Sequence, residues 1–162
     1  MHWIRNRGWI SETRALELYP PFFLMRVKVV EVSEGWRQIR LRLPLNAFSR
    51  NPGGAMFGGY QAAVADPVAA LACARVFPGY DVWTRELSVD FRRRGSTDLE
   101  LRFDFPPDQE ITIGEQLESR GSSTPSFEYG FHLADGTLCT AVRSVVAIRP
   151  RGYSAATQPP AA

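Results

Sequence analysis

The chain has 162 residues, of which 44% are hydrophobic and 22% are charged, and its formal net charge at pH 7 is +2. These values are ordinary for one globular domain, and so small a positive charge does not indicate a nucleic-acid-binding protein. Cys73 and Cys139 lie far apart in apolar surroundings. Two such cysteines predict neither a disulfide framework nor a zinc site.

No targeting or membrane-spanning segment is evident. The first ten residues are interrupted by Arg5, Arg7 and Gly8 and lack the apolar core of a signal peptide. The longest apolar run, residues 62–74, contains Asp66 and falls short of the roughly 20 residues that a membrane helix needs. We therefore expect a soluble, cytoplasmic protein.

The first half of the chain predicts a short helix, a β-hairpin and one long helix. Residues 11–18 form the short helix, which two prolines end. Apolar and polar residues then alternate from Phe23 to Val29 and again over residues 38–43, as in two strands joined by a turn at Glu34-Gly35. After an irregular segment, an alanine-rich helix is expected over about residues 59–76.

The second half predicts four more strands. Residues 107–120 could form a turn or a short helix, and Asp135-Gly136 is a two-residue hairpin turn. The four strands are expected over residues 87–91, 99–105, 127–133 and 138–148. The fold class is therefore α+β, with an antiparallel sheet of about six strands that curls around the apolar helix. An unpaired sheet edge favours a homodimer with one continuous sheet.

Asp66 is the most unusual residue in this pattern, since it is the one ionisable residue between Gly58 and Ala74. A carboxylate buried in a core helix is costly unless it is hydrogen-bonded. Pro67 follows it, removes one helical N–H and is expected to bend the helix. Asp66 is therefore a candidate general base or nucleophile. The alternative is structural, with Asp66 capping a new helical segment that begins at Pro67.

Two further features precede the helix. Gly58-Gly59 at its start lets backbone N–H groups approach a ligand, and such groups can form an oxyanion hole. The structural alternative is a tight turn that requires glycine. Asn51 can both donate and accept hydrogen bonds, although Asn-Pro-Gly-Gly on its own also indicates a simple turn.

Together, Asn51, Gly58-Gly59 and Asp66 resemble the hot-dog-fold thioesterases, in particular the phenylacetyl-CoA type. That family carries an asparagine, a His-Gly-Gly motif and an apolar helix whose acidic residue follows the second glycine by seven positions, as Asp66 follows Gly59. Residues 84–91, followed by three arginines, also resemble the family's strand after the helix. Phe57 stands at the position of the family's histidine, so a polar orienting group is missing.

The resemblance covers about residues 22–149 and implies a domain organisation. Residues 1–21 are expected to form an N-terminal extension, residues 22–150 the hot-dog domain and residues 151–162 a disordered tail. The implied function is hydrolysis of an acyl-CoA or related thioester, with coenzyme A as part of the substrate and with no metal or other cofactor.

The resemblance also implies a role for each site residue. Asp66 acts as the base for water or as the nucleophile, the N–H groups of Gly59 and Gly58 stabilise the oxyanion, and Asn51 of the partner chain orients the carbonyl or the water. The site forms between subunits of a homodimer, or of a homotetramer built as a dimer of dimers. The acyl group lies along the helix, lined by Phe57, Tyr60, Val64, Trp83 and Thr84.

Arg92, Arg93 and Arg94 could hold a coenzyme A phosphate, because arginine forks suit phosphate oxygens; the alternative is a solvated strand end. His2 and His132 are the two histidines and are expected at the surface, which argues against the hydratase branches of the same fold. No pattern for nucleic-acid or membrane binding is present. The alternative function is a non-catalytic acyl-CoA or acyl-group binding module with the same pocket, and a scaffold with a functional dimer interface is a third.

Overall fold

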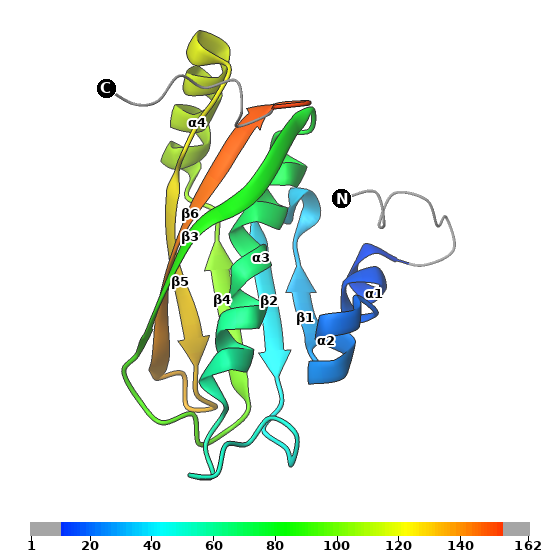
Figure 1. Cartoon of the computed structure of the whole chain (residues 1–162), viewed down its shortest axis with the longest axis vertical. Coiled ribbons are helices and arrows are strands. Elements are labelled where there is room, and N and C mark those ends of the chain that lie inside the picture. The colour runs from blue at the N-terminus through cyan, green and yellow to red at the C-terminus, as the bar shows by residue number, and fades with distance from the viewer. Residues whose placement is uncertain (1–10, 154–162) are drawn as a thin grey trace.

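A six-stranded antiparallel sheet wraps around one long helix in the computed structural model, which describes residues 11–153 (Figure 1). The strand order is β1-β2-β4-β5-β6-β3. The strands are β1 (Lys28–Val32), β2 (Gln38–Leu43), β3 (Tyr80–Phe91), β4 (Leu99–Asp104), β5 (Ser126–His132) and β6 (Leu138–Pro150). The long helix is α3 (Gly58–Val76). The predicted α+β class, the six strands and the central helix are confirmed.

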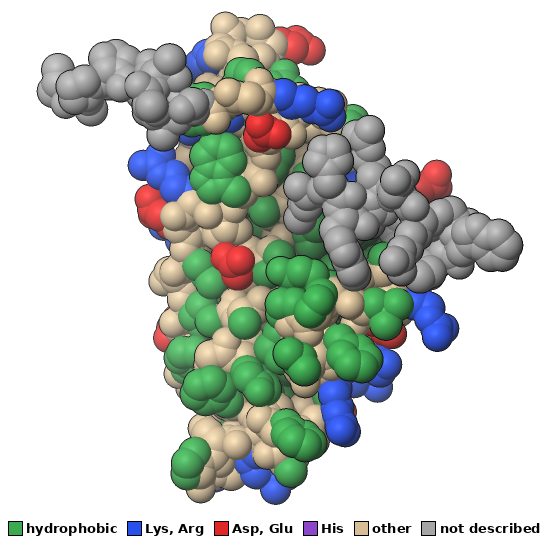
Figure 2. Space-filling view, turned by 45° about the vertical axis from the view of Figure 1, so that its right-hand side comes forward, with side chains coloured by type: hydrophobic (Ala, Val, Ile, Leu, Met, Phe, Trp, Pro, Cys, Tyr) green, Lys and Arg blue, Asp and Glu red, His purple; other side chains and the backbone are tan. Residues whose placement is uncertain are grey.

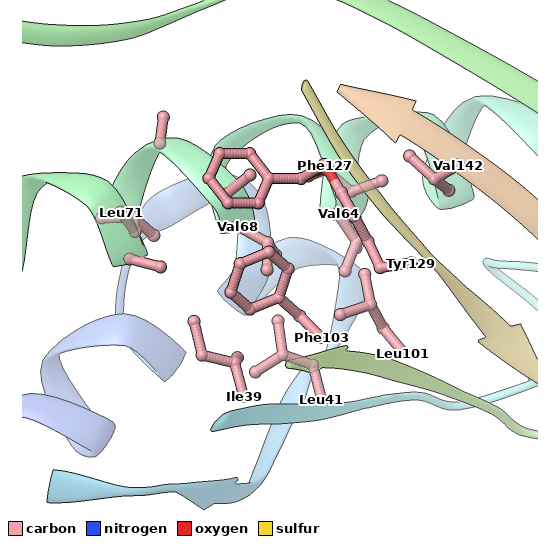
Figure 3. Close-up of a cluster of buried hydrophobic side chains, with 14 of the residues drawn as sticks. Ile39, Leu41, Val64, Val68, Leu71, Leu101, Phe103, Phe127, Tyr129 and Val142 are labelled. Carbon is pink, nitrogen blue, oxygen red and sulfur yellow. Dashed lines mark hydrogen bonds between the residues drawn. The ribbon is translucent and has the colours of Figure 1, made fainter. Parts of the chain in front are cut away.

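The core lies between α3 and the facing side of the sheet (Figure 3). Alternate residues of β2, β4 and β5 point inward, as the period-two pattern requires. They meet Val64, Val68 and Leu71 of the helix. Complete burial of one such side chain contributes about 1.5–3 kcal/mol. This packing holds α3 in place although no side chain caps its N-terminus at Phe57. The inward side chains include Ile39, Leu41, Leu101, Phe103, Phe127 and Tyr129.

Helix α3 runs through Pro67 without interruption over 19 residues. The alternative in which a new helical segment begins at Pro67 is therefore wrong. Val64, Ala65 and Val68 on either side of the proline are buried. Their packing offsets the hydrogen bond that the proline removes from the helix interior.

The N-terminal region differs from the sequence prediction after its first helix. Helix α1 (Glu12–Glu17) is confirmed, and the Ser11 hydroxyl accepts a hydrogen bond from the Arg14 amide at 3.3 Å. The strand predicted from Phe23 is wrong, because Pro20–Met25 forms a second short helix, α2. Proline suits the first turn of a helix, and Phe22 and Met25, three residues apart, bury one face of α2. The strand begins at Lys28.

Residues 107–120, for which the sequence left a turn and a short helix open, form helix α4 (Pro107–Arg120), which joins β4 to β5. Only Ile113 and Leu117 of α4 are buried, which explains its weak apolar pattern. Strand β3 begins at Tyr80, well before the predicted Leu87. The turn at Glu34-Gly35 is confirmed, since η1 (Glu34–Trp36) joins β1 to β2. The second turn lies where it was expected but is not the predicted two-residue loop: the Leu133 amide donates to the carbonyl of Thr137, so residues 134–136 form the loop, with Gly136 at a positive φ of 83°.

Some predictions concern residues 1–10 and 154–162, including His2, and lie outside the described residues. Among the described helices, none is long and apolar enough to cross a membrane.

Candidate functional site

Asp66 lies on the face of α3 that the sheet leaves open. Gly59, Ala63 and Asp66 are exposed, whereas Val64 and Ala65 are fully buried. Residues spaced in this way share one side of a helix. The predicted burial of Asp66 is therefore wrong for the single chain, because the sheet covers the opposite side of α3. Its carboxylate is accessible to solvent or to a second chain.

Hydroxyl groups of the sheet hold the helix backbone next to Asp66. Thr84 Oγ1 in β3 donates a hydrogen bond to the carbonyl oxygen of Asp66 at 2.6 Å, and the Tyr129 hydroxyl in β5 donates one to the carbonyl of Ala65 at 2.8 Å. Burial raises the pKa of Tyr129 far above its usual value, so this hydroxyl stays protonated and remains a donor. Sequence reasoning missed Tyr129, which resembles any other core aromatic in the strand pattern.

The N-terminus of α3 presents two free amides on the open side of the helix. Gly58 and Gly59 occupy its first two positions, where N–H groups have no helical acceptor. Neither amide donates to another group within residues 11–153. The amides of the next two residues bond to the carbonyl of Phe57. A helix N-terminus with free N–H groups favours an anion or a developing negative charge.

Two aromatic rings explain why these positions are glycines. A Cβ at Gly58 would lie 2.8 Å from Cζ of Phe91, and one at Gly59 would lie 2.5 Å from Cε1 of Phe57. Both rings are about half exposed, at 52% for Phe91 and 50% for Phe57. Neither glycine has a positive φ, and a side chain at either place would have to displace one of the rings. Phe91 was predicted as part of a strand and not as part of the site.

Asn51 is occupied with its own turn. Its Oδ1 accepts a hydrogen bond from the Ala55 amide at 3.1 Å, and its carbonyl accepts one from Gly54 at 2.8 Å. The side chain therefore shapes the loop that leads into α3, and its Nδ2 group remains available as a donor. Within the described chain, no hydrogen bond connects Asn51 with Asp66.

The predicted acyl-lining residues separate into two groups. Phe57 and Tyr60 pack edge to face with ring centres 5.6 Å apart beside the free amides, and Thr84 lies next to Asp66. Val64 is fully buried between the helix and the sheet (Figure 3). Trp83 precedes Thr84 and points to the other face of the strand, where it stacks with Tyr153 at 6.1 Å. Val64 and Trp83 are thus not on the open face.

The arginines after β3 lie at the same end of the molecule as the Asn51 turn. All three are exposed. The Arg94 guanidinium is next to Gly54, 3.2 Å from the position that a Cβ there would take. Arg92 pairs with Asp90 at 2.8 Å, and the carbonyl of Arg93 accepts a hydrogen bond from the Cys139 thiol. Of these three arginines, Arg94 is therefore the one seen in contact with the loop that leads into α3.

A separate depression of about 580 Å³ lies on the side of the sheet away from α3, over Gly130 and Ala141. Its rim carries charges of both signs, including Arg102 and Glu128. His132 lines it, and burial together with the positive charge of Arg102 lowers the pKa of this histidine. The expected surface position of His132 is thus only partly correct, since its Nδ1 is buried and has no partner among the described residues. The depression has no contact with Asp66.

Comparison with known proteins places this geometry in a family. The profile of the DUF4442 family, a domain of unknown function, matches residues 8–144. No curated protein matches the chain significantly.

Solved structures share the fold at low sequence identity. A Pseudomonas aeruginosa protein of unknown function, PA5026, described as a probable thioesterase, has a TM-score of 0.72 and 17% identity, covering 80% of this chain and 87% of its own. Thioesterase HI1161 of Haemophilus influenzae has a TM-score of 0.67 and 13% identity over 96% and 99% of the two chains. A variant of thioesterase SAV0944 of Staphylococcus aureus has a TM-score of 0.59 and 17% identity, over 78% and 95%. The chain therefore belongs to the DUF4442 family, and its fold is the hot-dog fold.

Proposed function

We propose that this protein hydrolyses an acyl-CoA or a related thioester on the open face of α3. The observation that carries the proposal is the position of Asp66, an exposed carboxylate on the same helix face as the free amides of Gly58 and Gly59. A base and a pair of N–H donors are the two groups that acyl transfer to water needs. The thioesterases among the structural neighbours support the same reaction class.

We expect the base and the N–H donors that act on one substrate to come from two different chains. Seven residues separate Gly59 from Asp66 within α3, which at about 1.5 Å per residue is about 10 Å along the helix axis. Donors must lie about 3 Å from the oxyanion, and the base must lie within hydrogen-bond reach of the attacking water. The proposed site therefore combines the glycine amides of one chain with Asp66 of a second chain.

The sheet offers a route to such a dimer. Strand β3 has 12 residues, none of them buried, and β6 is its only partner strand among residues 11–153. An edge strand of this length invites pairing with another strand. In a symmetric dimer with a continuous sheet, β3 would pair with β3 of a second copy. The two α3 helices would then lie on the same side of that sheet, with their open faces covered by each other.

The leaving group explains how the site works with Phe57 in place of a histidine. Asp66 accepts a proton from water as the water oxygen attacks the thioester carbon, and the amides of Gly59 and Gly58 stabilise the resulting oxyanion. When the intermediate collapses, the C–S bond breaks and the thiolate leaves. A thiol has a pKa of about 8.5, so a thiolate leaves without a strong general acid. In the alternative route, Asp66 attacks the carbon itself and water hydrolyses the anhydride.

Substrate binding would use the aromatic and basic residues at the start of α3. Phe57, Tyr60 and Phe91 offer an apolar surface beside the amides. Figure 2 shows hydrophobic side chains gathered over the lower part of the face turned toward α1 and α2, with charged side chains mainly at its margin. Arg94 and its neighbours would hold the phosphates of coenzyme A. Asn51 would use its free Nδ2 group to orient the carbonyl.

A panel of short, long and aromatic acyl-CoAs tests the proposal, with release of free thiol as the measurement. Asp66→Asn is the test variant. Glu118→Gln, an equivalent change at an exposed carboxylate of α4, is the matched control. We expect turnover of at least one substrate by the wild type and by Glu118→Gln, and its loss in Asp66→Asn. Equal turnover by all three proteins would show that Asp66 is not the base.

The alternative function is a binding module for acyl-CoA or acyl groups. The observation in its favour is the apolar ring of Phe57, which packs close to Gly59 at the position where the resembled family has a histidine. Calorimetric titration with the same panel distinguishes the two functions. Binding of at least one acyl-CoA of the panel, with no turnover of any of them, would support the binding module.

A further inference from the structure

Pro67 changes the hydrogen bonding of α3 beside Asp66. In a helix the amide of residue 67 would donate to the carbonyl of Ala63, and proline has no N–H to donate. The sheet hydroxyls reach the neighbouring carbonyls of Ala65 and Asp66. No side chain within residues 11–153 donates to the carbonyl of Ala63. Ala63 itself is exposed on the open face of the helix.

The residues that carry the freed carbonyl and the carboxylate lie close together on the helix. Ala63 and Asp66 are three residues apart and share the open face of α3. Helical side chains lean toward the N-terminus, over the turn that precedes them. The Asp66 carboxylate therefore leans over the turn that contains the Ala63 carbonyl. Two acceptors that face the same small volume suit a molecule with two donor hydrogens.

Water is that molecule. A carboxylate alone accepts one hydrogen of a water and leaves the water free to rotate about that bond. A second acceptor binds the other hydrogen and fixes the direction of the oxygen lone pair, and such orientation is a large part of catalytic rate enhancement. A backbone carbonyl serves this purpose well, because the helix holds it rigidly relative to Asp66.

We propose that Pro67 is a positioning residue, which frees the Ala63 carbonyl to orient the hydrolytic water that Asp66 deprotonates. This inference rests on the proposed thioester hydrolysis and deepens it, since it selects the general-base route over attack by Asp66 itself. In the step, one water proton passes to the Asp66 carboxylate and the water oxygen forms the bond to the thioester carbon. The other proton stays on the water oxygen, held by the Ala63 carbonyl.

Pro67→Ala is the first test variant, because it returns an N–H to position 67 that can occupy the Ala63 carbonyl. We expect a more thermostable protein whose kcat for hydrolysis falls about tenfold while KM stays within about twofold. Hydroxylamine as the acyl acceptor should still cleave the thioester at the wild-type rate, because its attack does not need that carbonyl. A loss of hydroxylamine cleavage that matches the loss of hydrolysis would overturn the proposal.

Lactic acid at position 67 is the matched control. The ester bond that it introduces has the methyl group of alanine but no N–H, so hydrolysis should return to within about twofold of the wild type. If this variant is as slow as Pro67→Ala, the proline ring matters rather than the missing N–H, and the proposal is wrong. If Pro67→Ala keeps the full kcat while Asp66→Asn loses it, the inference fails and the proposed function stands. If the wild type turns over no thioester, both fail together.

Discussion

The Thr84 hydroxyl and the Asp66 carbonyl are joined by a 2.6 Å hydrogen bond that connects edge strand β3 to the middle of α3. The residue proposed as the base is thus fixed to the strand proposed as the dimer interface. A change in how β3 pairs would move the backbone of Asp66 directly. The activity of the site is therefore expected to depend on the assembly of the sheet.

Replacement of Thr84 tests this connection. Thr84→Val keeps the shape of the side chain and removes the donor, which should lower the free energy of unfolding by about 0.5–1.5 kcal/mol. Loss of the anchor should also lower kcat severalfold, since Asp66 is then held less firmly. Thr84→Ser retains the hydroxyl and is the control. Urea unfolding measures the stability and thiol release measures kcat. A wild-type kcat in Thr84→Val would show that this hydrogen bond does not matter for catalysis.

Gly59→Ala places a methyl group against the ring of Phe57, whose Cε1 lies 2.5 Å from the new atom. The ring must move, and we expect a loss of about tenfold in kcat/KM, because the displaced ring changes the surface at the proposed oxyanion donor. Phe57→Ala combined with Gly59→Ala relieves the clash. The two changes should therefore be strongly non-additive in thermal stability, and simple additivity would show that the ring and the glycine are independent.

The stability of the fold should fall at high pH because of Cys73. Burial raises the pKa of this thiol to about 12, whereas the unfolded chain releases the proton near 9. The stabilisation that comes from keeping this thiol protonated in the folded protein is fully present below about pH 9. It is lost as the pH rises toward 12, by up to about 1.4 kcal/mol per pH unit. Cys73→Ala should show a shallower decline in urea unfolding between pH 8 and 10. If the free energy of unfolding falls equally with pH in Cys73→Ala and in the wild type, the buried thiol is not the cause.

A shared site predicts complementation between two impaired variants, each changed in a different part of the site. Asp66→Asn and Gly59→Ala chains, when co-expressed, should form mixed dimers in which one of the two sites contains neither change. When the two chains pair at random, about a quarter of all sites are therefore intact. Purified mixtures of tagged chains and thiol release measure this fraction. If no activity returns in verified mixed dimers, each chain supplies both groups to its own site.

Patterns with a clear period were predictable from the sequence. The alternation over residues 38–43, the turn at Asp135-Gly136 and the alanine-rich helix all appear where expected, because each depends on local burial or local backbone geometry. Helix α2 was missed because Phe23 and Met25 fit a strand as well as a helix, and the prolines at its start decide between them.

The site was less accessible to sequence reasoning. Asp66, Gly58 and Gly59 could be selected by spacing, but the exposure of Asp66 depends on which side of α3 the sheet covers. The contacts of Tyr129 with Ala65 and of Phe91 with Gly58 join residues more than 30 positions apart. No local pattern encodes such pairs, since they follow from the order of the strands.

The most direct measurement is thiol release from the acyl-CoA that the wild type cleaves fastest, compared with Asp66→Asn at the same pH. The account predicts that the variant remains folded and has the same oligomeric state, and that its kcat falls at least about 100-fold. A folded variant that retains at least half of the wild-type kcat would contradict the assignment of Asp66 as the catalytic base.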